Sequence, residues 1–336
     1  MRGNWLNLGS VEVSTRVVLL ILLDALRDQA DPVLRWLLAG DPAIRWQVLR
    51  DLTDAKRSVW EAERRRVART GWGARLLQEQ AADGTWGGGL YSPKWTSTTY
   101  TLFLLRDLGL PASHPAARKG CRLLLDRGLW SDGGIDLSVT TRRSETCMTG
   151  MVFSLAVCFQ PEDARIETIV RHLLEEQMPD CGWNCERWRG ATHSSFHTTI
   201  NVLEGLQEYA LTHGASSTQA ADAAARGQEF LLAHQLFRSH RTGQIVHPSL
   251  TRFSFPPRWH YDILRALDLF RAANADLDPR LADAVALIEK RRRRDGRWLL
   301  QNRHPGRTFF EMESVGQPSR WNTLRALRVL RWWRGR

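Results

Sequence analysis

The chain has 336 residues, of which 43% are hydrophobic and 25% charged, and its formal net charge is +11. This composition is that of an ordinary globular protein and excludes a disordered or fibrous chain. The longest apolar run, residues 17–23, is far shorter than the roughly 20 residues that cross a bilayer, and no small-residue cleavage site of a secretory signal follows it. Five cysteines, an odd number, argue against a disulfide framework. We therefore expect a cytoplasmic protein.

The positive charge comes almost entirely from arginine, since only four of the 47 basic residues are lysine. The arginines are spread over the whole chain with acidic residues between them, whereas a nucleic-acid-binding protein clusters its charge on a recognition element. We therefore expect no nucleic-acid partner. Two interpretations of the excess stay open: a genomic preference for arginine, or attraction to phosphates, diphosphates or an anionic membrane surface. The second would place the protein at the membrane periphery.

Fifteen tryptophans indicate a structural feature that recurs along the chain. The recurring feature is a helix followed by a turn. In the segment before each turn, apolar residues recur at three- and four-residue steps, as on one face of a helix. An Asp-Gly or similar turn then ends the helix, because glycine readily adopts the left-handed conformation there. Tryptophan or isoleucine closes the turn. The turns begin at Asp83, Asp132, Asp180 and Asp295, with a weaker copy at Thr242.

After each turn an irregular stretch leads to a second helical segment, which opens with Ser, Thr or Pro. No segment reads as a β-strand, because β-branched runs bounded by turns are absent. We predict an all-α fold, a single (α/α)6 barrel domain over residues 1–336 in which six helical hairpins place parallel inner helices around a cavity. Residues 1–30 form an N-terminal helical extension or the first hairpin. The inner helices are expected at residues 42–50, 95–108, 144–158, 196–209, 259–270 and 321–333.

Residues 80–86, Gln-Ala-Ala-Asp-Gly-Thr-Trp, resemble the Gln-…-Gly-x-Trp (QW) motif of squalene and oxidosqualene cyclases. Gln177 stands six residues before Trp183, at the same spacing. The chain thus resembles the terpenoid cyclase and protein prenyltransferase (α/α)6 toroid superfamily, as a squalene cyclase-like repeat protein. It departs from the motif at Ile135, Cys181 and Arg292. Because the family's motif is structural, the resemblance implies that the turn tryptophans are buried away from the cavity: Trp86, Trp183 and Trp298.

The resemblance implies an enzyme that acts on an isoprenoid or other apolar small molecule in an aromatic-lined cavity. Cyclases of this family start carbocation chemistry with the desolvated acid of an Asp-x-Asp-Asp segment, and no such segment occurs in this sequence. Two alternatives therefore stay open. One is a carbohydrate-active (α/α)6 hydrolase or lyase, which needs two cavity carboxylates. The other is a non-catalytic lipid-binding or scaffold barrel.

The candidate site residues lie at the starts of the inner helices, because parallel helix N-termini converge at one end of a barrel and favour anions there. Each candidate also has a structural interpretation, as a helix-terminal carboxylate, a hydrogen-bonded histidine or a core aromatic. The candidates for acid–base chemistry are Glu145, His197, His260 and Asp262. Those for substrate binding are Trp95, Trp259, Trp321, Asn322 and Cys147.

One loop combines Asp, Cys and His and therefore suggests zinc, the one cofactor that the sequence indicates. Protein prenyltransferases, which the chain resembles, hold zinc with Asp and Cys at one inner-helix start and His at the next. The corresponding residues here are Asp180, Cys185, His197 and His260, although His197 stands where that family has its Cys. Because His197 and His260 open successive inner helices, we expect their rings within about 10 Å of each other, at one cavity mouth.

Overall fold

A computed structural model describes residues 31–138, 142–214 and 218–335. The prediction for residues 1–30 lies outside this part. The described chain is built almost entirely of helices, which confirms the predicted all-α class. Its named strands, β1 (Trp298–Leu299) and β2 (Pro318–Ser319), form one short antiparallel pair. Over the same residues, no helix combines the length and the apolar character that a bilayer crossing requires.

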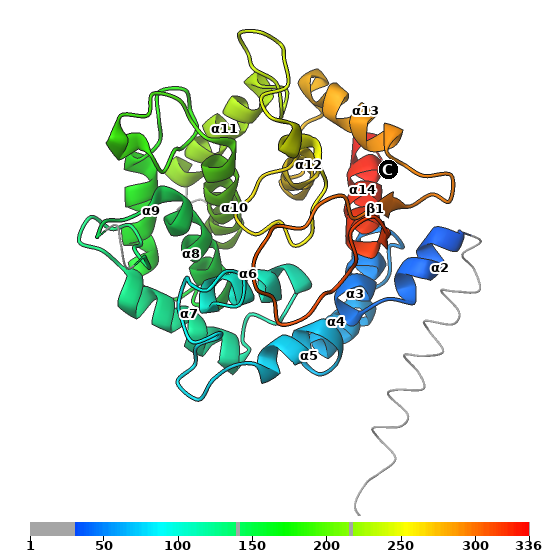
Figure 1. Cartoon of the computed structure of the whole chain (residues 1–336), viewed down its shortest axis with the longest axis horizontal. Helices are drawn as coiled ribbons and strands as arrows, with labels where there is room; N and C mark the ends of the chain where they lie inside the picture. Colours follow the sequence, from blue (N-terminus) through cyan, green and yellow to red (C-terminus); the bar gives the residue numbers. More distant parts are fainter. Residues whose placement is uncertain (1–30, 139–141, 215–217, 336) are drawn as a thin grey trace, which may run out of the picture.

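Outer and inner helices alternate along the described chain, except that α4 and α5 are both outer, and they form a ring (Figure 1). The ring closes because α14, the last helix, packs against α3. The outer helices are α2 (Pro32–Leu38), α4 (Arg57–Arg65), α5 (Gly71–Gln78), α7 (Pro115–Gly128), α9 (Arg165–Glu175), α11 (Thr218–Ala233) and α13 (Ala282–Lys290). The inner helices are α3 (Pro42–Asp51), α6 (Thr98–Leu108), α8 (Thr146–Phe159), α10 (Phe196–His213), α12 (Ile263–Ala272) and α14 (Arg320–Trp333).

The inner helices match the predicted segments to within a few residues. The largest differences are of four residues: α10 ends at His213 and not at residue 209, and α12 begins at Ile263 and not at residue 259. Asp262 decides the start of α12, because its carboxylate accepts a hydrogen bond from the backbone N–H of Arg265 and so caps the helix. Four 3₁₀ turns complete the named helices of the described chain: η1 (Arg66–Ala68), η2 (Arg187–Arg189), η4 (Pro248–Thr251) and η5 (Pro279–Leu281).

The turn tryptophans tie each outer helix to the inner helix that follows it. Trp86, Trp183 and Trp298 are 0% exposed, which confirms the prediction that they are buried. Their indole N–H groups donate to carbonyls of the preceding outer helix, on Leu76, Leu173 and Ile288. Their backbone N–H groups donate to threonine hydroxyls of the following inner helix, on Thr98, Thr199 and Thr323.

The glutamines of the turns connect neighbouring hairpins. Gln80 donates from Nε2 to the carbonyl of Gly84 in its own turn and to that of Ala116 on the next outer helix, α7. Gln177 makes the same two bonds to Cys181 and to Ala223 on α11. These bonds join each turn to the outer helix of the next hairpin.

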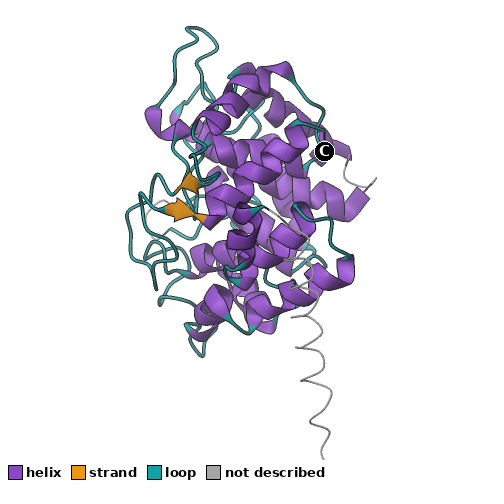
Figure 2. Ribbon diagram, turned by 90° about the vertical axis from the view of Figure 1, so that its right-hand side faces the viewer, coloured by secondary structure: helices purple, strands orange, loops and turns teal. Residues whose placement is uncertain are grey.

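The two ends of the ring differ. Long connections lead from each outer helix to the next inner helix, so they gather at the N-terminal ends of the inner helices, on one side of the molecule (Figure 2). Two of them cross this end and pair with other segments: Gln301 N–H donates to Phe253 O, and Arg307 exchanges backbone hydrogen bonds with Lys94 and Trp95. The chain itself therefore closes this end of the ring.

Candidate functional site

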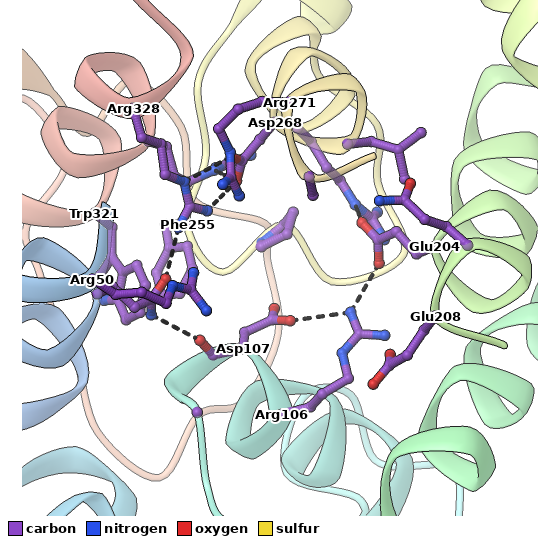
Figure 3. A pocket seen from close by; sticks show the side chains of 18 of the residues that line it. Arg50, Arg106, Asp107, Glu204, Glu208, Phe255, Asp268, Arg271, Trp321 and Arg328 are labelled. Carbon is purple, nitrogen blue, oxygen red and sulfur yellow. Dashed lines mark hydrogen bonds and ion pairs between the residues drawn. The ribbon is translucent and has the colours of Figure 1, made fainter. Parts of the chain in front are cut away.

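A cavity of about 430 Å³ lies inside the ring, between the C-terminal halves of the inner helices (Figure 3). Its size falls within the roughly 300–1,000 Å³ that small-molecule sites occupy. Phe255 and Pro257, from the loop before α12, form part of its wall together with Trp321 of α14. The rings of Phe255 and Trp321 stack with their centroids 4.0 Å apart. One wall of the cavity is therefore aromatic.

The other walls are charged. Arginines outnumber carboxylates there, seven to four. The C-terminal ends of helices carry partial negative charge, which arginines in the last turns partly neutralise. The remaining excess of positive charge favours a ligand that carries an anionic group. The arginines are Arg50, Arg64, Arg106, Arg265, Arg271, Arg325 and Arg328, and the carboxylates are Asp107, Glu204, Glu208 and Asp268.

Glu204, on α10, lies between two guanidinium groups from two other inner helices, α6 and α12. Its Oε2 accepts a hydrogen bond from Arg106 at 2.8 Å, and its Oε1 accepts one from Arg265 at 2.7 Å. Burial alone would raise the pKa of Glu204, but the two arginines outweigh it and lower that pKa to about 2. Asp268 is ionised for the same reason, since Arg328 and Arg271 hold its pKa well below the usual range despite burial.

Asp107 and Glu208 behave in the opposite way. Burial raises the pKa of Asp107, and the neighbouring Arg106, 3.1 Å away, only partly offsets it. Burial likewise raises the pKa of Glu208, with the negative charge of Glu204 adding to the effect. One cavity thus contains two carboxyl groups whose pKa is raised and two whose pKa is lowered. This combination is typical of acid–base sites.

Of the candidates predicted from the sequence, Trp321 is the one that lines this cavity within the described chain. Asp262 and Asn322 are buried and hold loops to the ring. The Asp262 carboxylate accepts hydrogen bonds from the N–H and hydroxyl of Ser254 and caps α12. Asn322 Nδ2 donates to the carbonyls of Phe253 and Leu299. Neither residue lines the central cavity, so their roles in a site remain predictions from the sequence.

The two predicted histidines do come together, at the closed end of the ring. The ring centroids of His197 and His260 lie 5.6 Å apart, within the predicted distance. His260 stacks on Trp259 and on His304, each at 3.7 Å. Trp95 packs edge-on against His260 and donates its indole N–H to the carbonyl of His304. These five residues form an aromatic cluster.

The four predicted zinc ligands do not converge. Asp180 accepts hydrogen bonds from the backbone N–H and the hydroxyl of Ser194, at 2.8 and 2.5 Å. The thiol of Cys185 lies against that of Cys147, and this contact is the main cause that lowers the pKa of Cys185. In residues 31–138, 142–214 and 218–335, no three His, Cys, Asp or Glu side chains come together as metal ligands do. The donor set for the predicted zinc ion is therefore not assembled.

Glu145, the remaining predicted acid, is the N-cap residue of α8 and is half-buried, and its side chain makes no capping hydrogen bond. Burial raises its pKa, and the nearby Asp136 and Glu186 add to the effect. Glu145 does not line the central cavity, so its role as a general acid remains a prediction from the sequence.

We expect the fold to lose stability as the pH falls from 6.5 toward about 4, because of the aromatic cluster. Burial lowers the pKa of His197 to about 4, of His260 to about 3 and of His304 to about 4, from an ordinary 6.5. In this range the unfolded chain binds protons that the folded chain does not, so stability decreases with decreasing pH. The urea concentration at the midpoint of unfolding should therefore change less between neutral pH and about pH 5 in His260→Asn than in the native chain.

The matched control for this experiment is His193→Asn, since His193 is exposed. It should keep the pH dependence of the native chain. Equal pH dependence in His260→Asn and the native chain would contradict the assignment of buried neutral histidines to this cluster.

The sequence analysis missed the cavity carboxylates, although a signal for them exists. Inner helices are buried, so their charged residues at helical spacing face either a partner or a cavity. Glu204 and Glu208 stand four residues apart on α10, and Arg265 and Asp268 stand three apart on α12. These pairs place charges on one face of helices that are otherwise apolar.

The chain matches no family model and no curated protein. Among solved structures it is similar to the type II terpene cyclase MstE from Scytonema. For a variant in complex with merosterolic acid A, the identity is 14% and the TM-score 0.34, over 80% of this chain and 95% of that one. For the ligand-free form, the identity is 14% and the TM-score 0.32, over 80% of this chain and 96% of that one. For a variant in complex with geranylgeranyl dihydroxybenzoate, the identity is 13% and the TM-score 0.34, over 80% of this chain and 94% of that one. The likeness concerns the arrangement of helices.

Proposed function

We propose that this protein is an enzyme that binds a small molecule with an anionic group in the central cavity and donates protons to it from Asp107 and Glu208. The observation that carries the proposal is the contrast among the cavity carboxyls. Burial raises the pKa of Asp107 and Glu208, whereas the arginines keep Glu204 ionised. A carboxyl that holds its proton beside fixed charges is suited to general acid catalysis.

The cavity walls indicate the chemical class of the substrate. Seven arginines against four carboxylates favour an anionic group such as a carboxylate or a diphosphate. The wall formed by Phe255, Pro257 and Trp321 offers an apolar surface to an apolar part of the same molecule. We therefore propose an isoprenoid, or another largely apolar molecule, that carries an anionic head. Terpene cyclase-like protonation is the reaction class that such a substrate and such acids support.

A carbohydrate-active enzyme is the second candidate. The observation that favours it is the number of carboxyl groups facing one polar cavity, since glycoside cleavage uses a pair of them. Given the arginines, the corresponding substrate would be an acidic sugar.

The proposal is tested by incubating the protein with prenylated carboxylic acids and prenyl diphosphates, because each joins an apolar chain to an anionic group, and detecting products by mass spectrometry. With a substrate found, Asp107→Asn or Glu208→Gln should reduce kcat by about 10²–10⁴, the usual contribution of a general acid. Both substitutions preserve size and remove only the acidic proton.

The matched control is Glu162→Gln, which alters an exposed carboxylate outside the cavity and should leave kcat unchanged. Full activity in the double variant Asp107→Asn/Glu208→Gln would refute the proposed acids. Turnover of uronate oligosaccharides, without turnover of any prenylated probe, would establish the second candidate in place of the first.

A further inference from the structure

Arg258 is a buried cation without a counter-ion. The residue is 6% exposed, and among the described residues its guanidinium makes neither a hydrogen bond nor an ion pair. Its neighbours are the ring of Trp95, whose centroid lies 5.5 Å from the guanidinium carbon, and, farther away, the carboxyl of Asp107 and the hydroxyl of Tyr100. Desolvation lowers the pKa of Arg258 to about 10. An aromatic face compensates a buried charge only in part.

The other buried arginines of the ring are paired. Arg265 donates to Glu204, and Arg328 forms ion pairs with Asp268 and Asp51. Arg325 lies within 3.9 Å of the carboxylates of Asp262 and Asp268. Burial of an unpaired charge costs several kcal/mol in general, so the isolation of Arg258 needs a cause of its own.

Arg258 lines a second, narrow cavity, which is distinct from the central one. This cavity has a volume of about 40 Å³ and lies between α6 and the loop that precedes α14. A single buried water needs about 10–15 Å³ of such space, so the cavity has room for a few waters or one oxyanion group. Most of its wall is apolar or aromatic and includes Phe255, Phe309, Phe310 and Met312.

The carboxylates at the edge of this cavity are engaged elsewhere. Glu311 forms an ion pair with Arg303. Glu313 accepts hydrogen bonds from the hydroxyl of Ser319 and from the backbone N–H of Arg320. Neither is therefore the counter-ion of Arg258. The charge of Asp107 acts on this guanidinium only from beyond ion-pair distance, so the described chain leaves Arg258 without a paired negative charge.

We infer that this narrow cavity is a binding site for a small oxyanion, a carboxylate or a phosphate group, with Arg258 as its counter-ion. The planar fork of a guanidinium matches the geometry of both groups. Low dielectric around the site strengthens the pairing, because apolar side chains exclude water. The inference does not depend on the acids of the central cavity. The two cavities share the side chain of Phe255, so an occupied oxyanion site would set the position of one wall of the central cavity.

The inference is tested by calorimetric titration of the purified chain with sodium acetate and with inorganic phosphate, against sodium chloride at constant ionic strength. We expect saturable binding of one oxyanion per chain, and the two titrations distinguish a carboxylate from a phosphate site. Arg258→Gln should weaken this binding at least about tenfold, because it removes a charge-assisted hydrogen bond. The matched control is Arg334→Gln, which alters an exposed, paired arginine outside this cavity and should retain binding.

A second readout separates binding from a structural role of Arg258. Without oxyanion, Arg258→Met should unfold at the same temperature as the native chain or higher, because it removes an unpaired buried charge. Lower thermal stability of Arg258→Met would assign Arg258 to structure and overturn the inference. Absence of saturable binding to the native chain, or equal binding to Arg258→Gln, would overturn it as well. Glu208→Gln should bind the oxyanion normally, because Glu208 is not among the groups that act on Arg258, so this test and that of the proposed acids fail independently.

Discussion

Glu204→Gln is expected to destabilise the folded ring by about 3–5 kcal/mol, the usual cost of breaking a buried ion pair from one side. The substitution keeps the size of the side chain but removes the negative charge between Arg106 and Arg265. Both guanidinium groups would then lie in the protein interior with too little compensating charge. The free energy of unfolding, from urea denaturation at neutral pH, measures the effect.

The pH dependence of stability provides a second measure of the same interaction. The folded state lowers the pKa of Glu204 from an ordinary 4.5 to about 2. The stabilisation is therefore complete above pH 4.5 and is lost as the pH falls toward 2. Glu204→Gln should lack this part of the acid destabilisation. As control, Glu289→Gln removes an exposed partner of Arg334 and should change stability by no more than about 0.5 kcal/mol. Equal stability of the two variants would contradict the network.

Trp86→Ala is expected to cost about 3–5 kcal/mol, the range observed when a buried aromatic side chain is deleted. The indole is completely buried and bonded to the carbonyl of Leu76, so its removal leaves both a cavity and an unpaired acceptor. The ring also packs closely on α7, where a Cβ at Gly120 would lie 2.7 Å from it. Urea denaturation of the full chain measures the loss.

The control for Trp86→Ala is Trp188→Ala, because Trp188 is 45% exposed. That substitution should change stability by about 0.5 kcal/mol or less. A cost for Trp86→Ala no larger than that of Trp188→Ala would contradict the role of the turn tryptophans in tying the helices together.

Local patterns were sufficient to predict the helical hairpins. Apolar residues at three- and four-residue steps bury one face of a helix in any tertiary setting, and the Asp-Gly turns end the outer helices wherever they occur. The turn tryptophans were likewise predictable as buried residues. The bond from the tryptophan N–H to a threonine hydroxyl spans 12 residues at Trp86, 16 at Trp183 and 25 at Trp298. The repeat therefore preserves its geometry while the loop between its two ends varies in length.

The place of the central cavity was not predictable in this way. The predicted site lay at the N-terminal ends of the inner helices, and two of the residues chosen for it, His197 and His260, do meet there. That end is closed, because two loops without periodic patterns pair with each other and with the segment at Lys94 and Trp95. How such loops pack depends on contacts between distant parts of the chain, which helical periodicity does not record.

The chemistry of the cavity was decided by the tertiary structure as well. Glu204 is 98 residues from Arg106 and 61 from Arg265 along the chain, and the ring brings all three together. The sequence determined which helices form and which of their faces are buried, because those properties follow from local spacing. Which carboxyl groups keep a proton depends on the charges that other helices place beside them and on the loss of water around them, and these follow only from the closure of the ring.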